Sequence, residues 1–295
     1  MFHRTPATTT RWSGWALRIL LLAGPTWAVG CGPSVVNLTN AAWVPSPVPV
    51  KYDDRAFATV LRENVKDGLV DYNHLKAHPE PLQQYLGLIS VVGPTTQPGD
   101  FTSRSSQLAY FINAYNAGVL QAVLYRGIPE TVHDVRLPPF EKSHSIVVDG
   151  VPRTLAVLRQ LVWANSSADA RAEFALCDAA LGSPPLAGQP IRPDTLRRDL
   201  RELAAAAMAN GRQIRIDHER RELLVSRAIF LRQPEFLEFY ARQTGSRTGS
   251  LLSALLQLAE GPRRDWLNTA IGYRIAAIPF DRNLNLWTRA SAGAR

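Results

Sequence analysis

The sequence predicts an α+β fold: a helix-rich single domain with a small antiparallel sheet packed around a buried central helix. Three observations support this prediction. Many stretches repeat apolar residues at helical spacing, two stretches have the pattern of a β-hairpin, and one helical stretch is apolar on most sides. A hydrophobic content of 46% in 295 residues is enough for a sizeable core, which excludes a disordered chain.

Residues 1–30 have the pattern of a bacterial export signal, because a basic start is followed by an apolar run and small residues. Residues 28–31 resemble a lipobox, whose cysteine, here Cys31, becomes the lipidated first residue of the mature protein. An ordinary secretory signal is the alternative. Prolines predict an extended tether over residues 31–51 that holds the domain away from the bilayer. We therefore expect an envelope lipoprotein, with the outer membrane favoured because no aspartate follows the cysteine.

The folded domain is predicted to cover residues 52–290. Its helices are indicated by apolar residues that recur every three or four positions, so that each helix has one face toward the core. A short extended piece is expected over residues 69–72. In chain order, the predicted helices lie around residues 57–65, 82–89, 108–125, 155–162, 196–207, 236–240 and 251–258.

Two β-hairpins are predicted. The first joins residues 145–148 to residues 151–154 through Asp149-Gly150, a dipeptide that favours the tight turns of hairpins. Pro152 cannot donate a backbone hydrogen bond and therefore places the second strand at an edge. The second hairpin joins residues 213–217 to residues 222–226.

The central helix of residues 108–125 carries polar side chains that its apolar surroundings would bury. Ser105 or Ser106 is its expected N-cap. Asn113 and Asn116 must find hydrogen-bond partners, and a buried amide without one costs about 1–3 kcal/mol. Two interpretations stay open: the amides bind neighbouring loop backbone, or they reach a ligand pocket. With Tyr115, which shares their apolar arc, they are candidate binding residues.

Composition limits the classes of partner. The net charge of +8 falls to +5 without residues 1–30, which carry three arginines and no acidic residue. No lysine-rich run or alternation of basic and aromatic residues suggests a nucleic-acid groove, so no nucleic-acid partner is predicted. The two cysteines lie in different contexts and show no zinc-type spacing, and neither a metal nor a cofactor is predicted.

Four stretches resemble the domain of unknown function 547 family, and they occur in the family's order. Residues 68–72 resemble its early Asp-Tyr signature, and residues 109–117 resemble its most specific motif, an aromatic pair followed by Ile-Asn-Ala-Tyr-Asn-Ala. Residues 174–186 resemble its second motif, and residues 280–285 resemble its closing motif. The resemblance implies a family but no particular reaction.

The sequence departs from the family pattern where reactive groups are expected. The second motif of the family typically has a histidine where this chain has Glu173, and cysteines where it has Asp178 and Ser183. A Glu-His pair of the family corresponds to Arg159 and Gln160. If the family uses thiol and imidazole groups, this chain has lost both kinds together.

Ser183 and Asp178 are nevertheless the candidate catalytic residues. Gly182 allows a sharp turn and Pro184 favours extended backbone, so we expect Ser183 to be exposed on a rigid loop. A serine nucleophile needs a general base, which Asp178 could orient but not replace. Cys177 ends an apolar run and is expected to be a buried filler.

The preferred hypothesis is a non-catalytic binding or interaction module, with a small molecule or an envelope protein as its ligand. The alternative is a hydrolase that uses Ser183 or a relocated histidine such as His133 or His144. A purely structural envelope protein is a third hypothesis. Asp281 and Asn285 are expected to tie the last loop to the core and are further candidate binding residues.

Overall fold

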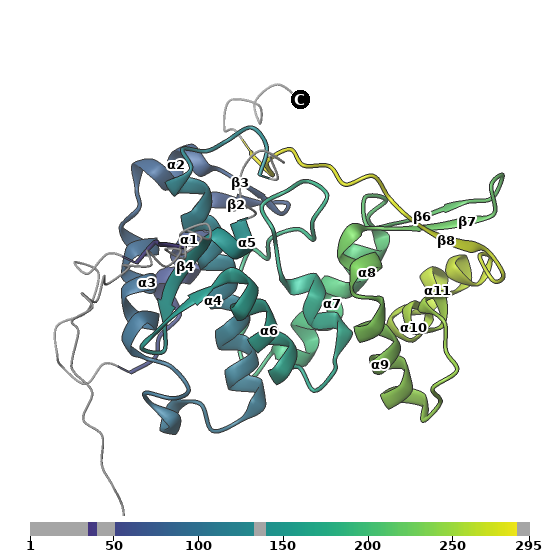
Figure 1. Ribbon diagram of the computed structural model, residues 1–295, viewed down its shortest axis with the longest axis horizontal. Helices are drawn as coiled ribbons and strands as arrows, with labels where there is room; N and C mark the ends of the chain where they lie inside the picture. The colour runs from purple at the N-terminus through teal and green to yellow at the C-terminus, as the bar shows by residue number, and fades with distance from the viewer. Residues whose placement is uncertain (1–34, 40–50, 133–139, 288–295) are drawn as a thin grey trace, which may run out of the picture. The chain divides into compact units, whose positions relative to one another are not determined.

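Helix α4, Arg104–Tyr125, is the element around which the neighbouring helices pack (Figure 1). The computed structural model describes residues 35–39, 51–132 and 140–287, which belong to one compact unit, Pro33–Arg295. Most residues of α4 are buried, as the sequence predicts. Its N-cap is Ser103 rather than Ser105 or Ser106: Ser103 and Ser106 form a capping box that satisfies two backbone N–H groups.

The first hydrophobic cluster surrounds α4. Helices α3, α6 and α2 and strand β4 contact α4, and α1 packs against α3. Each helix buries its apolar side, and Phe57 of α1 stacks on Tyr85 of α3 with ring centroids 4.8 Å apart. The four predicted helices of this half are confirmed as α1, α3, α4 and α6; the sequence does not predict the other helices of this half. Their bounds are α1 Arg55–Asn64, α2 Tyr72–Ala77, α3 Glu80–Val91, the 3₁₀ turn η2 Pro98–Asp100, α5 Phe140–Ser143, α6 Leu155–Asn165 and the 3₁₀ helix η3 Ala170–Ala175.

A second hydrophobic cluster is built from later elements. Phe174 of η3 packs against Phe236 of α9, with ring centroids 5.9 Å apart, and α7 contacts η3. The three helices that the sequence predicts here are confirmed as α7, α9 and α10; the sequence does not predict the other two. Their bounds are α7 Leu196–Ala209, α8 Arg227–Leu231, α9 Gln233–Thr244, α10 Leu251–Leu258 and α11 Gly261–Asn268.

The described strands form three small sheets, where the sequence predicts one small antiparallel sheet. Both predicted hairpins are present, and β5 is at an edge as Pro152 requires. Each hairpin also gains a parallel strand that the sequence does not indicate: β1 beside β4, and β8 beside β7. The class remains α+β. The strands are β1 Val36–Asn37, β2 Val65–Lys66, β3 Leu69–Val70, β4 His144–Val148, β5 Val151–Thr154, β6 Ile214–Asp217, β7 Glu222–Val225 and β8 Arg274–Ala277.

Strand β1 changes the interpretation of the tether predicted over residues 31–51. Val36 lies opposite His144, and the backbone N–H of Leu38 donates to the carbonyl of Ser145 at 2.7 Å. Leu38 is only 5% exposed and belongs to the core around α4. This part of the stretch is therefore fixed to the folded unit, because its backbone completes a sheet edge and its leucine is buried.

The C-terminal segment, residues 281–287, runs back across the first half of the chain. Its backbone bonds residues 68–72, 130–132 and 179–183, including Val70 N–H to the Asn285 carbonyl at 2.8 Å and Asn285 N–H to the Ala179 carbonyl at 2.9 Å. These loops are far apart in sequence and are held in register by one strand-like segment. Among the described residues, no helix combines the length and apolar character needed to cross a bilayer.

Gly68 is required by a close approach of two loops. Its φ angle is +78°, and a Cβ atom built on it would lie 2.3 Å from the Cβ of Pro185. Gly68→Ala should therefore lower the free energy of unfolding by at least about 2 kcal/mol, since strain and overlap add. Urea unfolding followed by circular dichroism measures the loss. Gly211→Ala is the matched control, because no atom lies within 4 Å of its added Cβ; an equal effect of the two changes would contradict the expectation.

Candidate functional site

The amide of Asn116 fixes the loop that follows η3. Its Nδ2 donates to the Ala175 carbonyl at 2.8 Å, and its Oδ1 accepts from the Cys177 N–H at 3.1 Å. One buried side chain thus satisfies two backbone groups on either side of Leu176. Asn116 therefore binds neighbouring loop backbone, the first of the two interpretations that the sequence leaves open.

Asn113 repeats the arrangement one helical turn earlier. Its Nδ2 donates to the Ile191 carbonyl at 2.8 Å, and its Oδ1 accepts from the Ile191 N–H at 2.9 Å. Because the carbonyl and the N–H both belong to Ile191, the amide fixes the backbone of this residue, which begins the segment that leads into α7. These bonds use one N–H and the carbonyl oxygen of each amide, and they tie both side chains to loop backbone.

Arg159, on α6, is the centre of a buried charge network at the positions where the family resemblance expects glutamate, histidine and cysteine. Its guanidinium donates to the carboxylates of Glu173 and Asp178 and, at 2.8 Å, to the hydroxyl of Tyr115. Tyr115 donates its own proton to Asp178 at 2.6 Å. Glu141 of α5 lies 3.7 Å from the same guanidinium. Residues from α4, α5, α6, η3 and the loop that follows η3 therefore meet at one cation.

The electrostatics of this network are set by burial. Desolvation opposes the charge of Arg159, but the carboxylates of Asp178 and Glu173 outweigh it and raise the pKa of the guanidinium. Burial raises the pKa of Glu173 and of Glu141 above their ordinary range, although Arg159 attracts both. Burial also raises the pKa of Tyr115. One guanidinium thus faces three carboxylates, and the network stays together only while Arg159 is present.

Ser183 is not exposed, contrary to the expectation from Gly182 and Pro184. It is 4% accessible, and its hydroxyl donates to the Ala180 carbonyl at 2.7 Å and accepts from the Asp178 N–H at 3.2 Å. The loop turns inward because the backbone of Gly182 packs against residue 281, where an added Cβ would come within 3.0 Å of backbone atoms. The Ser183 hydroxyl therefore organises the loop that carries Asp178.

Cys177 is the buried filler that the sequence predicts. Its Sγ lies 3.7 Å from the Ser183 hydroxyl and 3.5 Å from the Asn285 amide nitrogen. Burial raises the pKa of this thiol to about 11. Since the thiolate is the nucleophilic form, the thiol is unreactive near neutral pH.

The two C-terminal candidates have different surroundings. Asn285 accepts a hydrogen bond from the Tyr72 hydroxyl at 2.8 Å and donates to the Gly68 carbonyl at 3.3 Å, so it ties the last segment to the core as expected. Asp281 accepts from the Asn283 N–H at 3.1 Å and shapes its own turn. No described contact joins either side chain to the Arg159 network.

The described histidines have local partners. His144 shares a hydrogen bond with Ser143, His74 with Asn64, and His218 with Tyr273. Among the described residues, no hydrogen bond joins a histidine to Ser183 or Cys177. His133 and the lipidation candidate Cys31 both lie outside the described residues. Within residues 35–39, 51–132 and 140–287, no group of three or more metal-ligating side chains is arranged to hold a metal ion.

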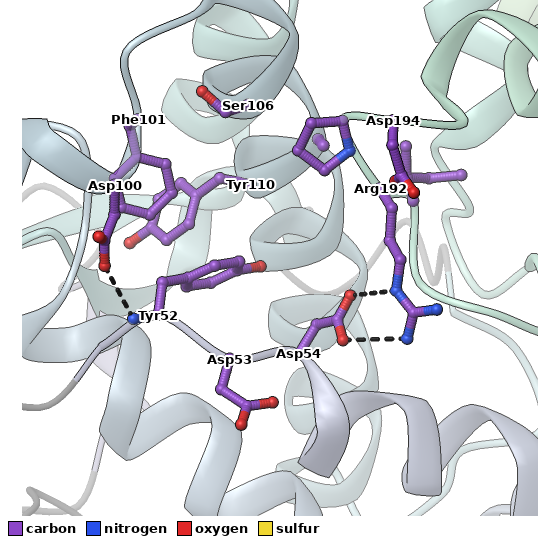
Figure 2. A pocket seen from close by; sticks show the side chains of 12 residues that line it. Tyr52, Asp53, Asp54, Asp100, Phe101, Ser106, Tyr110, Arg192 and Asp194 are labelled. Carbon is purple, nitrogen blue, oxygen red and sulfur yellow. Dashed lines mark hydrogen bonds and ion pairs between the residues drawn. The ribbon is translucent and has the colours of Figure 1, made fainter.

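A pocket of about 300 Å³ opens beside the first turns of α4 (Figure 2). The rings of Tyr52, Phe101 and Tyr110 form its aromatic wall, with centroids 5.0–5.5 Å apart. Burial raises the pKa of Tyr52 to about 12. Figure 2 shows the Tyr52 ring lying across the cavity, with the segment that Asn113 fixes, residues 191–194, on the opposite side.

Carboxylates line the rest of this pocket. Asp54 forms two hydrogen bonds with Arg192, at 2.8 and 3.1 Å, and Asp100 accepts from the Tyr52 N–H at 3.1 Å. Asp53 also lines the pocket, and it pairs with Arg55, which is not part of the lining. Asp194 is the fourth carboxylate. The lining therefore carries an excess of negative charge against one guanidinium.

The sequence indicates Arg159 only as a departure from the family pattern, not as a site residue, and it does not predict the Tyr52 pocket. A signal for Arg159 was present: relative to the family pattern, one position changes from acidic to basic while another, Glu173, changes from histidine to acidic. Such opposite changes favour a rearranged ion pair. No comparable signal marks the pocket, since Asp54 and Arg192 are separated by 138 positions.

Arg159→Met should destabilise the protein by about 3–5 kcal/mol at pH 7.5, because Glu173 and Asp178 would lose their buried counter-charge. The raised pKa of Glu173 sets the sign of the pH dependence. The stability that Glu173 contributes in its protonated form is fully present below pH 4.5, the ordinary pKa of a glutamate. This stability is lost as pH rises through the raised pKa of Glu173 in the folded state. The deficit of the variant should therefore shrink at pH 5, as measured by urea unfolding.

The double variant Arg159→Met/Glu173→Gln provides the control for this expectation. It should recover part of the lost stability at pH 7.5, since it removes one unpaired charge with little change in shape. A deficit of the same size at both pH values, with no recovery in the double variant, would show that packing rather than charge accounts for the loss.

Comparison with known proteins assigns the region that holds this network. Residues 100–206 match the family model described as a protein of unknown function, DUF547. No curated protein and no solved structure matches the chain. The matched stretch contains Tyr115 on α4, Arg159 on α6, Glu173 on η3 and Asp178 on the loop that follows η3. The chain therefore contains a domain of the DUF547 family.

Proposed function

We propose that this protein is a membrane-anchored envelope lipoprotein whose domain binds a ligand without catalysing a reaction. The observation that carries the proposal is the Arg159 network. At the family positions suited to thiol and imidazole chemistry, this chain has a guanidinium and carboxylates that bond one another. The nearby hydroxyl of Ser183 and thiol of Cys177 are buried, and neither has a base positioned to activate it in the described geometry.

The pocket beside α4 is the ligand site in this proposal. Its volume lies at the lower end of the range for small-molecule sites, and it combines an aromatic wall with convergent polar groups. Asp100 and Asp194 add negative charge that the single guanidinium of Arg192 does not offset. The favoured ligand is a small organic cation, an amine with an apolar part that contacts Tyr52.

The anchor rests on the sequence. The basic start, the apolar run and the small residues before Cys31 support lipidation of that cysteine. A lipid-anchored receptor samples ligands at the membrane without a spanning segment. The alternative, a hydrolase that uses Ser183 or a relocated histidine, would need a conformation in which the Ser183 hydroxyl leaves the Ala180 carbonyl and enters a cleft.

Phenethylamine should raise the melting temperature of the protein, whereas 2-phenylethanol, its neutral counterpart, should not. At a tenfold excess over the dissociation constant, binding stabilises by about 1.4 kcal/mol, which corresponds to roughly 3 °C. Asp194→Asn should remove most of the shift because it removes a carboxylate from the lining. Asp265→Asn is the matched control, since Asp265 is an exposed aspartate outside the pocket lining. Differential scanning fluorimetry measures each shift.

Two results would contradict the binding proposal. Equal shifts with the amine and the alcohol, unchanged in Asp194→Asn, would remove the cation site. Covalent labelling of the native protein by a fluorophosphonate, lost in Ser183→Ala, would favour the hydrolase instead.

Cys31→Ser should move the protein from the membrane fraction to the soluble fraction of cells, because the substituted residue cannot receive a lipid. Cys177→Ser is the matched control and should stay in the membrane fraction, since Cys177 is buried in the folded domain. Immunoblots of fractionated cells provide the measurement. Continued membrane retention of Cys31→Ser would contradict the anchor.

A further inference from the structure

Strand β1 limits how far the folded unit can lie from Cys31. Val35 is the first described residue, and Val36 is already paired with His144. Four residue steps separate Cys31 from Val35, and a fully extended chain covers at most about 14 Å in that number of steps. Whatever attaches to Cys31 must therefore lie close to the place where β1 enters the sheet.

The surface around that place has the side chains of a membrane-facing rim. Val35 is 50% exposed, and Tyr125, at the C-terminal end of α4, is 58% exposed. The Tyr125 ring lies 5.7 Å from the ring of His144, the residue that pairs with Val36, so both exposed apolar side chains adjoin the start of β4. Lys142, two residues before β4, is also exposed.

We propose that this rim, formed by Val35, Tyr125 and Lys142, lies against an anionic phospholipid surface and so sets the orientation of the domain. The inference rests on the proposed lipid anchor, because the short connection from Cys31 brings the rim to the bilayer. Tyrosine is favoured at the membrane–water interface, where its ring is apolar and its hydroxyl hydrated. A lysine near the surface attracts anionic headgroups.

The orientation has a consequence for α4. Residues 104 and 125 are separated by 21 helical steps, about 32 Å along the axis. When the Tyr125 end contacts lipid and the helix points away from it, the first turns of α4 lie far from the bilayer. The pocket beside Ser106 and Tyr110 is then presented to the aqueous side, where a dissolved ligand can reach it.

Site-directed fluorescence can test this orientation. The lipidated protein carrying Tyr125→Cys is labelled with the environment-sensitive dye NBD and reconstituted into phosphatidylethanolamine–phosphatidylglycerol vesicles that contain lipids with nitroxide headgroups. Arg104→Cys, an exposed position at the other end of α4, is the matched control. Cys177 is buried with a raised pKa, so it stays unlabelled in the native protein, which the protein without an introduced cysteine verifies.

The nitroxide lipids should quench the dye at residue 125 several-fold more than the dye at residue 104. The difference should shrink in vesicles of neutral phosphatidylcholine, because the lysine loses its anionic partner. Val35→Cys gives a second reporter at the rim if Tyr125→Cys fails to fold. Equal quenching at both ends of α4, or stronger quenching at residue 104, would overturn the inference while the protein remains attached to vesicles. Failure of the lipidated protein to bind vesicles would instead overturn the anchor, and the orientation with it.

Discussion

Two carboxamides on one buried helix position both sites of this domain. Asn116 holds the backbone on either side of Leu176, and the chain continues from there into Asp178 and the Arg159 network. Asn113 holds Ile191, and the chain continues from there into Arg192 and Asp194 of the pocket. A side-chain amide that satisfies both a carbonyl and an N–H acts like a short piece of strand pairing inside a helical core. The precision of both sites therefore depends on the burial of α4.

The members of the Arg159 network depend on one another because they are buried charges and hydrogen-bonding groups. Removing one partner from a buried set of charges and hydrogen bonds is costly, because the groups left behind are buried without a partner. Here a guanidinium, two acidic side chains and a tyrosine hydroxyl complement one another across α4, α6 and η3. Tyr115 contributes twice, because its ring faces the Arg159 guanidinium at 4.9 Å while its hydroxyl bridges to Asp178.

The local sequence pattern was sufficient to predict much of the fold. Helical periodicity located α4 and α7, and Asp149-Gly150, both with positive φ angles, located the first hairpin. The parallel strands β1 and β8 could not be predicted, because each is short and joins a hairpin that lies far along the chain. The family resemblance indicates the positions of Arg159, Glu173 and Asp178, but only the fold brings their side chains together. The burial of Ser183 escaped prediction because a distant segment, not the residues next to it, closes the loop.

The C-terminal segment bears on when this protein can fold. Residues 281–287 supply the backbone partners of three loops, and they belong to the part of the domain that leaves the ribosome last. Until that segment arrives, the Val70 N–H, the Ala179 carbonyl and the Gly182 N–H lack the backbone partners that they have in the folded domain. The native packing of these three loops is therefore completed only after residues 281–287 have been synthesised, however early the helices form.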